Sequence, residues 1–139
     1  MNRGVGRDIV LPKVFVDNAE LSVKAEQAMQ VLARKYGRPM DSGRNRIVFS
    51  TGRFVLKFPR SLNGEADNNH EGCVQGPTKA RSRCIEFMGF ACVMQERLQR
   101  IYQDVKRPKE LPKWTDSVDC MQVGYDRQGR LKAYDYGIR

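Results

Sequence analysis

The chain has 139 residues and carries 25 Lys and Arg against 16 Asp and Glu, a formal net charge of +9 at pH 7. This length corresponds to one domain, which we take as residues 1–139. No apolar run reaches the ~18 residues of a membrane helix, and the basic N-terminus lacks a signal peptide's apolar segment, so we expect a cytoplasmic protein without a membrane partner. The charge favours acidic partners and excludes the strongly acidic inhibitors that imitate DNA.

The cysteines and the single histidine argue against metal and hydrolase chemistry. The four cysteines form no C-x-x-C pair, and His70 is the one histidine. Zinc sites use paired Cys or His at short spacing, and both Ser-His-Asp and Cys-His catalysis would depend on His70. The sequence therefore predicts neither a zinc site nor a hydrolase of these types.

Residues 1–13 are expected to be a flexible lead-in, followed by a helix over residues 17–36. Asp17 is the expected N-cap, and Glu20 completes a capping box. Apolar residues recur at helical spacing and predict a buried stripe on this helix, namely Leu21, Ala25, Ala28, Met29, Leu32 and Tyr36. Gly37 ends the helix.

A β-hairpin is predicted next, with strands over residues 46–49 and 53–58 joined by a Ser-Thr-Gly turn. Residues 40–45 can turn a shorter strand back into this hairpin. The polar segment 63–75 is expected to be a loop that runs into an exposed helix.

The second half of the chain predicts two further strand pairs. Strands are expected over residues 83–87 and 90–94, and again over 121–125 and 130–134 around a Gly-containing turn. Between the pairs we expect a short helix over 95–105 and a surface connection over 106–113. This order predicts an α+β fold, an antiparallel sheet with flanking helices.

One residue breaks the pattern of its strand. Lys57 lies in Phe-Val-Leu-Lys-Phe, where the hairpin should be buried, and a buried ammonium needs an anion nearby. Glu65 and Glu71 follow in the next segment, and Asp135 follows the last hairpin. We expect Lys57 to lie within ion-pair distance of Glu71 or Asp135.

In this order the features resemble the nucleotide-binding lobe of the protein-kinase-like fold. The resembling segments are Ser42-Gly43-Arg44, Lys57, Glu71, the hinge-like stretch 93–98 with Glu96, the hairpin 124–132 and Asp135-Tyr136-Gly137. The sequences of these segments are most similar to those of short kinase-like proteins of tailed bacteriophages, and the resemblance covers residues 40–139. The second lobe is largely missing, because only 20 residues separate Glu96 from Ser117.

The resemblance implies ATP and magnesium as possible cofactors. Gly43 would lie over the phosphates, Lys57 would pair with them and with Glu71, and Asp135 would hold the metal. The backbone around Glu96 would meet the adenine ring. If the lobe is only a scaffold, no cofactor is expected.

The catalytic loop departs from the family pattern. Gln122 stands where the metal-binding Asn should be, and Ser117 stands where the catalytic base should be. Asp116 and Asp119 flank that position and are the candidate bases. The first hypothesis is therefore a catalytically impaired kinase-like protein, a monomer or small homo-oligomer, that binds and inhibits a host protein or defence complex.

Two alternatives stay open. One is an active Mg-ATP-dependent phosphotransferase with Asp119 or Asp116 as base and Gln122 assisting the metal. The other is a nucleic-acid-binding protein that uses the basic residues of the first hairpin, namely Arg44, Arg46, Arg53, Lys57 and Arg60.

Overall fold

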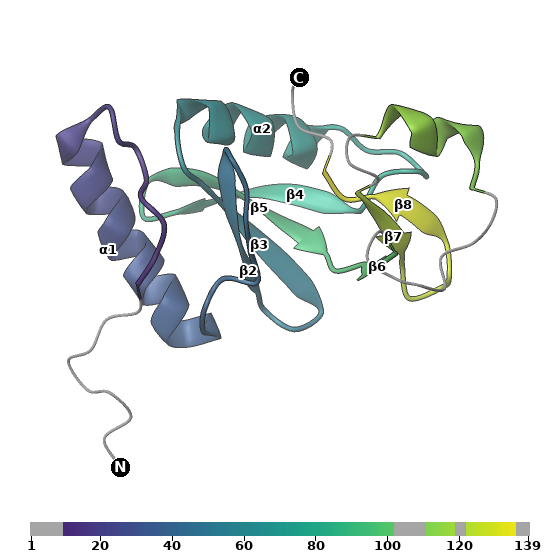
Figure 1. Ribbon diagram of the computed structural model, residues 1–139, viewed down its shortest axis with the longest axis horizontal. Coiled ribbons are helices and arrows are strands. Elements are labelled where there is room, and N and C mark those ends of the chain that lie inside the picture. Colours follow the sequence, from purple (N-terminus) through teal and green to yellow (C-terminus); the bar gives the residue numbers. More distant parts are fainter. Residues whose placement is uncertain (1–9, 102–110, 119–121, 136–139) are drawn as a thin grey trace, which may run out of the picture.

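The computed structural model describes residues 10–101, 111–118 and 122–135 (Figure 1). In chain order the elements are α1 (Ala19–Tyr36), β1 (Asp41–Ser42), β2 (Arg46–Ser50), β3 (Phe54–Pro59), α2 (Leu62–Cys73), β4 (Ser82–Phe87), β5 (Phe90–Glu96), β6 (Gln99–Arg100), the short 3₁₀ helix η1 (Lys113–Ser117), β7 (Val123–Tyr125) and β8 (Leu131–Ala133). The described part of the chain therefore has an α+β fold, as the sequence predicts.

The strands form two antiparallel sheets. The larger sheet has five strands in the order β1-β2-β3-β5-β4, and the smaller has three in the order β6-β7-β8. Lys57 lies on the central strand β3, opposite Val48 of β2 and Val93 of β5. Figure 1 has the larger sheet in the centre, α1 on the left and the smaller sheet on the right.

The five-stranded sheet has one apolar and one polar face. Leu56 and Phe58 of β3 point into the main hydrophobic core, which they share with α1. Because successive strand residues point to opposite faces, Lys57 points to the other side, where α2 packs. The helix α1 therefore covers the apolar face, and α2 covers the face that carries the buried charges.

A second hydrophobic cluster lies under the smaller sheet. Its buried members are Ala80, Leu98, Ile101, Val123, Ala133 and Tyr134. Backbone hydrogen bonds join β8 to the segment before β4, since Ala80 N donates to Ala133 O and Ala133 N donates to Thr78 O, both at 2.7 Å. These bonds connect the two sheets.

The start of α1 differs from the prediction by one residue. Asn18, not Asp17, is the N-cap, and its side chain accepts a hydrogen bond from Leu21 N at 3.0 Å. The predicted apolar stripe is confirmed at Ala25, Ala28, Met29 and Leu32, which are buried, while Leu21 and Tyr36 pack partly buried against the same core. Of the expected flexible lead-in, residues 1–9 lie outside the described residues.

The helix expected in segment 63–75 is present, but the expected loop before it is not, and one face of the helix is buried. α2 occupies nearly all of the segment, begins after the N-cap Ser61, and buries Gly64, Asp67, Asn68 and Glu71. The segment lacks an apolar stripe because its buried face meets polar groups of the sheet. A search for hydrophobic periodicity therefore misses this packing.

The predicted short helix over 95–105 is wrong in its described part. β5 continues to Glu96, and β6 (Gln99–Arg100) pairs with β7. Leu98 and Ile101 are buried, but they reach the second core from extended chain. Residues 102–105 and most of the predicted connection, 106–110, lie outside the described residues.

Over the described residues, no helix combines the length and the apolar character that crossing a membrane requires.

Candidate functional site

A buried ion pair joins the centre of the sheet to α2. Lys57 Nζ lies 2.9 Å from Glu71 Oε1, and the two residues are 4% and 0% exposed. Ser61 fixes the start of α2 by accepting from Gly64 N at 3.1 Å, and Glu71 lies nearly three turns later on the face toward the sheet. The ion pair expected for Lys57 is therefore present, and its partner is Glu71.

A second cation, Arg46 at the start of β2, binds the same carboxylate. Its NH1 lies 2.7 Å from Glu71 Oε1, and its NH2 donates to Glu71 Oε2 at 2.8 Å. The same NH2 group lies 2.5 Å from Asp135 Oδ1. Arg46 thus links Glu71 to Asp135, so Lys57, Glu71 and Asp135 all belong to one network.

Neutral groups complete this network. Asn68 of α2 accepts from Arg46 NH1 at 3.3 Å and donates to the carbonyls of Lys57 and Ala91 at 3.1 and 2.8 Å. Lys57 Nζ also donates to the backbone carbonyl of Tyr134. Hydrogen bonds therefore hold each charged group in one orientation inside the protein.

Burial and the neighbouring charges shift the pKa values of the three buried groups of the network, Glu71, Lys57 and Arg46. Burial raises the pKa of Glu71, but the nearby Lys57 and Arg46 outweigh it and lower this pKa to about 2. Burial lowers the pKa of Lys57, against the opposing effect of Glu71. Burial also lowers the pKa of Arg46, but its bonds to Glu71 prevail and the net change is a rise.

Sequence reasoning missed the role of Arg46. It grouped Arg46 and Lys57 with the basic residues of an exposed hairpin, whereas both are buried and paired with Glu71. Arg60 from the same set donates to the carbonyls of Lys13 and Gly43. Only Arg44 and Arg53 of that set are exposed, so the hairpin does not present the expected basic face.

Gly43 lies in the tight turn between β1 and β2. Its N–H donates to Arg46 O at 2.9 Å, and its carbonyl accepts from Arg60 NH1 at 2.8 Å. Both backbone groups thus have partners within the protein, although the resemblance expected this glycine to lie over phosphates.

Glu96, which the resemblance places in a hinge, takes part in a second ion-pair cluster. Its Oε2 lies 2.6 Å from Lys132 Nζ, which is also 3.0 Å from Asp126 Oδ2. Arg130 Nε lies 2.9 Å from the same Asp126 oxygen. Burial raises the pKa of Asp126, but bonds from Arg130 and Lys132 prevail and lower it. This cluster fastens the end of β5 to the β7–β8 hairpin.

The remaining predicted site residues are Gln122, Asp116 and Asp119. The Gln122 carbonyl accepts from Tyr134 N at 3.1 Å. Asp116 lies in η1 with its side chain outside the described part, and Asp119 lies outside the described residues altogether. Within the described residues, no three His, Cys, Asp or Glu side chains gather as a metal site.

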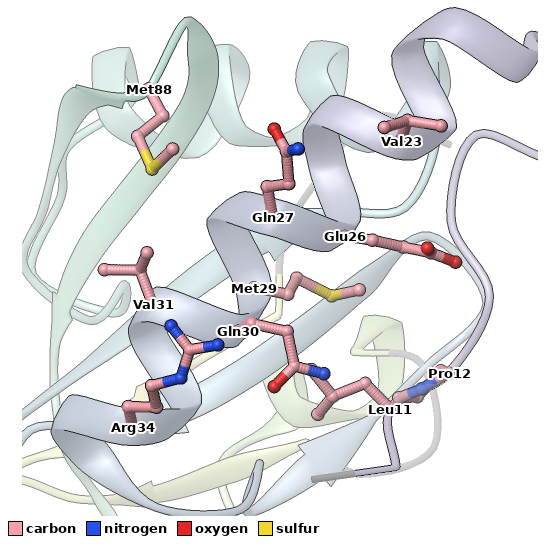
Figure 2. Close-up of a pocket in the computed structure, with 10 residues that line it drawn as sticks. All are labelled: Leu11, Pro12, Val23, Glu26, Gln27, Met29, Gln30, Val31, Arg34 and Met88. Carbon is pink, nitrogen blue, oxygen red and sulfur yellow. The ribbon is translucent and has the colours of Figure 1, made fainter. Parts of the chain in front are cut away.

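A cavity of about 510 Å³ lies along the outer side of α1 (Figure 2). Its apolar walls include Val23, Val31 and Met88, which are 56%, 41% and 54% exposed. Figure 2 places Met88 across from the helix, on the turn between β4 and β5. The cavity also has polar lining residues, among them Glu26 and Arg34.

No protein-family model matches this chain, and a search of curated proteins found no similar sequence.

Proposed function

We propose that this chain is a kinase-like lobe that has lost phosphoryl transfer and acts by binding a protein. The observation that supports this most directly is the position of Arg46, whose guanidinium pairs with both Glu71 and Asp135. If the chain is kinase-like, these two carboxylates correspond to those that hold the phosphate-binding lysine and the magnesium in a working kinase.

Several geometric features support the kinase-like part of the proposal. Lys57 lies on the third strand and pairs with Glu71 of the helix between the third and fourth strands. Asp135 follows the β7–β8 hairpin and approaches that pair through Arg46. Protein kinases use a lysine, a glutamate and an aspartate in these relative positions.

The charges of the network support the proposed loss of phosphoryl transfer. Magnesium binds carboxylate oxygens, but the Asp135 carboxylate faces a permanent cation at 2.5 Å. A divalent ion at the same place would be repelled by Arg46. Lys57 is bound by Glu71 and the Tyr134 carbonyl, so phosphates would have to displace existing bonds. These bonds support a structural role for the network.

The proposed partner is a host protein or a host defence complex. This step rests on the resemblance to short kinase-like proteins of tailed bacteriophages. The exposed apolar side chains around α1 support a binding role, because exposed apolar patches often mark protein contacts (Figure 2). The positive charge of the chain would attract an acidic partner.

The first test is a thermal shift with and without Mg-ATP at millimolar concentration. We expect no shift for the wild type. A working nucleotide site would be detected, because a ligand at 100 times its Kd stabilises the fold by about 2.7 kcal/mol. An Mg-dependent shift that the Lys57→Ala/Asp135→Ala variant loses, or transfer of labelled γ-phosphate, would overturn the proposal in favour of an active phosphotransferase.

The second test is retention of a host protein on the immobilised chain. We expect the wild type to retain one bacterial protein in stoichiometric amount. The Val23→Asp/Val31→Asp variant should lose it, and Lys24→Asp, an exposed change on the same helix, should keep it. Failure of the wild type to retain any host protein would contradict the binding role.

A further inference from the structure

A cavity of about 330 Å³ opens where one end of the five-stranded sheet meets the turn of the β7–β8 hairpin. We call it the arginine cavity, and its lining residues are Arg53, Phe54, Arg81, Glu96, Arg97, Arg127 and Gln128. Four separate segments of the chain contribute an arginine each. No residue of the Arg46–Lys57–Glu71 network lines it.

The arginine cavity is strongly positive. Its one acidic lining residue, Glu96, is paired with Lys132 at 2.6 Å, and Lys132 shares Asp126 with Arg130. The carboxylates around the cavity are therefore neutralised by lysine and arginine that do not line it. The positive charge of the four lining guanidinium groups remains available to a ligand.

Three of these arginines are not held by acidic groups of the described residues. Arg53, Arg81 and Arg127 are exposed and have no ion pair with any described carboxylate. Arg97 donates to Ser50 Oγ at 2.9 Å, a neutral partner. The four guanidinium groups repel one another, and a bound anion would relieve this repulsion. Their combined positive potential therefore attracts an anion to the cavity.

The chemistry of the lining indicates the class of anion. Guanidinium groups bind phosphate with paired hydrogen bonds. Phe54 lies in the same wall and is 38% exposed, so its ring is available for a flat group to stack on. Proteins that bind single-stranded nucleic acid typically combine two features. Arginines contact the phosphate backbone of the strand, and a nearby aromatic side chain stacks on a base. An acidic peptide would use the cations but has no need of the ring.

We propose that the arginine cavity binds single-stranded nucleic acid, with a phosphate between its guanidinium groups and a base against Phe54. This inference is independent of the proposed function, because none of its residues belongs to the buried network or to the α1 cavity. It also differs from the basic hairpin that the sequence indicates, since only Arg53 is shared.

The test is fluorescence anisotropy with a labelled 12-nucleotide oligothymidylate. The variant Arg81→Gln/Arg127→Gln removes two lining cations whose side chains have no hydrogen bond in the described structure. The matched control Arg38→Gln/Arg83→Gln removes two exposed cations that do not line the cavity. Phe54→Leu tests stacking separately. Melting temperatures verify that each variant is folded.

We expect the cavity variant to weaken binding about tenfold or more and the control less than threefold. The slope of log affinity against log salt should become shallower by about 0.7 for each contact removed. Phe54→Leu should weaken binding about fivefold or more, since a stacked base contributes about 1–3 kcal/mol.

Equal losses in the cavity variant and the control would overturn the proposal, as would the absence of any binding. Competition by decaglutamate as effective as competition by unlabelled strand would assign the cavity to acidic peptides instead. Competition by thymidine monophosphate at the same nucleotide concentration as the strand would assign it to free nucleotides. Either result rejects the strand as ligand.

Discussion

At the scale of single residues, the buried side chains of Arg46, Lys57 and Glu71 depend on one another. Glu71 is 0% exposed and is the shared acceptor of both cations. Removing one partner of a buried ion pair leaves an uncompensated charge in a poorly solvated place, which costs far more than removing a surface pair. Removing Glu71 leaves two cations without their shared partner, whereas removing one cation leaves Glu71 paired with the other. The loss of Glu71 should therefore cost more stability than the loss of either cation.

We expect Glu71→Gln to lower the free energy of unfolding by about 3–5 kcal/mol, because it removes the carboxylate that both buried cations share. Lys57→Met should cost less, since Arg46 still neutralises Glu71 through two bonds. Urea denaturation measures both values. Glu86→Gln, an exposed change on β4, is the matched control and should be nearly neutral. Equal costs for Glu71→Gln and Glu86→Gln would contradict the described network.

The same carboxylate predicts a dependence of stability on pH. The pKa of Glu71 falls from 4.5 to about 2 on folding, so its contribution is complete above the unfolded value and is lost as the pH falls toward the folded one. This contribution is on the order of 3 kcal/mol. The difference in unfolding free energy between wild type and Glu71→Gln should shrink as the pH is lowered through that window. A difference that stays constant would show that Glu71 is not ionised in the folded protein.

Part of this network could be predicted from the sequence. Lys57 is recognisable because a charged residue interrupts an otherwise apolar strand, and the next acidic helix supplies Glu71. Arg46 is not recognisable, because an arginine at the start of a strand is usually solvated. Its partner Asp135 lies 89 positions away, and no local pattern connects the two residues.

At the scale of elements, α2 packs closely against the β1–β2 turn and against β4. A Cβ on Gly64 would lie 2.2 Å from Asn45 O, and a Cβ on Gly72 would lie 2.7 Å from Cys84 N. These atoms belong to the backbone, which cannot rotate away as a side chain can, and a Cβ on Gly72 would also lie 2.1 Å from the side-chain Sγ of Cys84. These two glycines allow the approach that brings Glu71 to Lys57.

Gly64→Ala should therefore destabilise the protein, by about 1–3 kcal/mol. The sign of the stability change distinguishes the two effects. Alanine in a helix is otherwise favoured over glycine by about 1 kcal/mol, so a loss of stability would have to come from the close packing. Gly76→Ala is the control, because a Cβ there would meet nothing within 4 Å. Thermal unfolding compares the two variants. A stabilised Gly64→Ala protein would mean that α2 lies farther from the β1–β2 turn than described.

The elements that the sequence predicts well are those defined by local signals. The hairpin of β2 and β3 and that of β7 and β8 have alternating strands around glycine turns, and both are confirmed within one or two residues. The segment 95–101 fails because Leu98 and Ile101 have helical spacing, whereas pairing of β6 with β7 selects the extended chain. Strand pairing depends on tertiary contacts, and the spacing of apolar residues along the sequence does not predict them.

At the scale of the whole molecule, ion pairs connect the two sheets in addition to the second hydrophobic cluster. Arg46 with Asp135 and Lys132 with Glu96 each join the larger sheet to the β7–β8 region. Arg100 with Asp41 adds a partly exposed pair at 3.3 Å. The two hydrophobic clusters are separate, one under α1 and one under the small sheet. The cooperativity of unfolding should therefore depend on these ion pairs.

Lys132→Met tests this dependence, because Lys132 joins Glu96 of β5 to Asp126 of the hairpin. Glu96 loses its cation, whereas Asp126 keeps Arg130, so the hairpin itself should survive. We expect amide hydrogen exchange in β7 and β8 to accelerate about tenfold or more, equivalent to about 1.4 kcal/mol, while α1 and β3 keep their protection. Lys24→Met, which removes an exposed lysine of α1, should change neither region. If exchange accelerated equally throughout the molecule, the two sheets would form one cooperative unit held by their cores, and the polar junction would contribute to global stability alone.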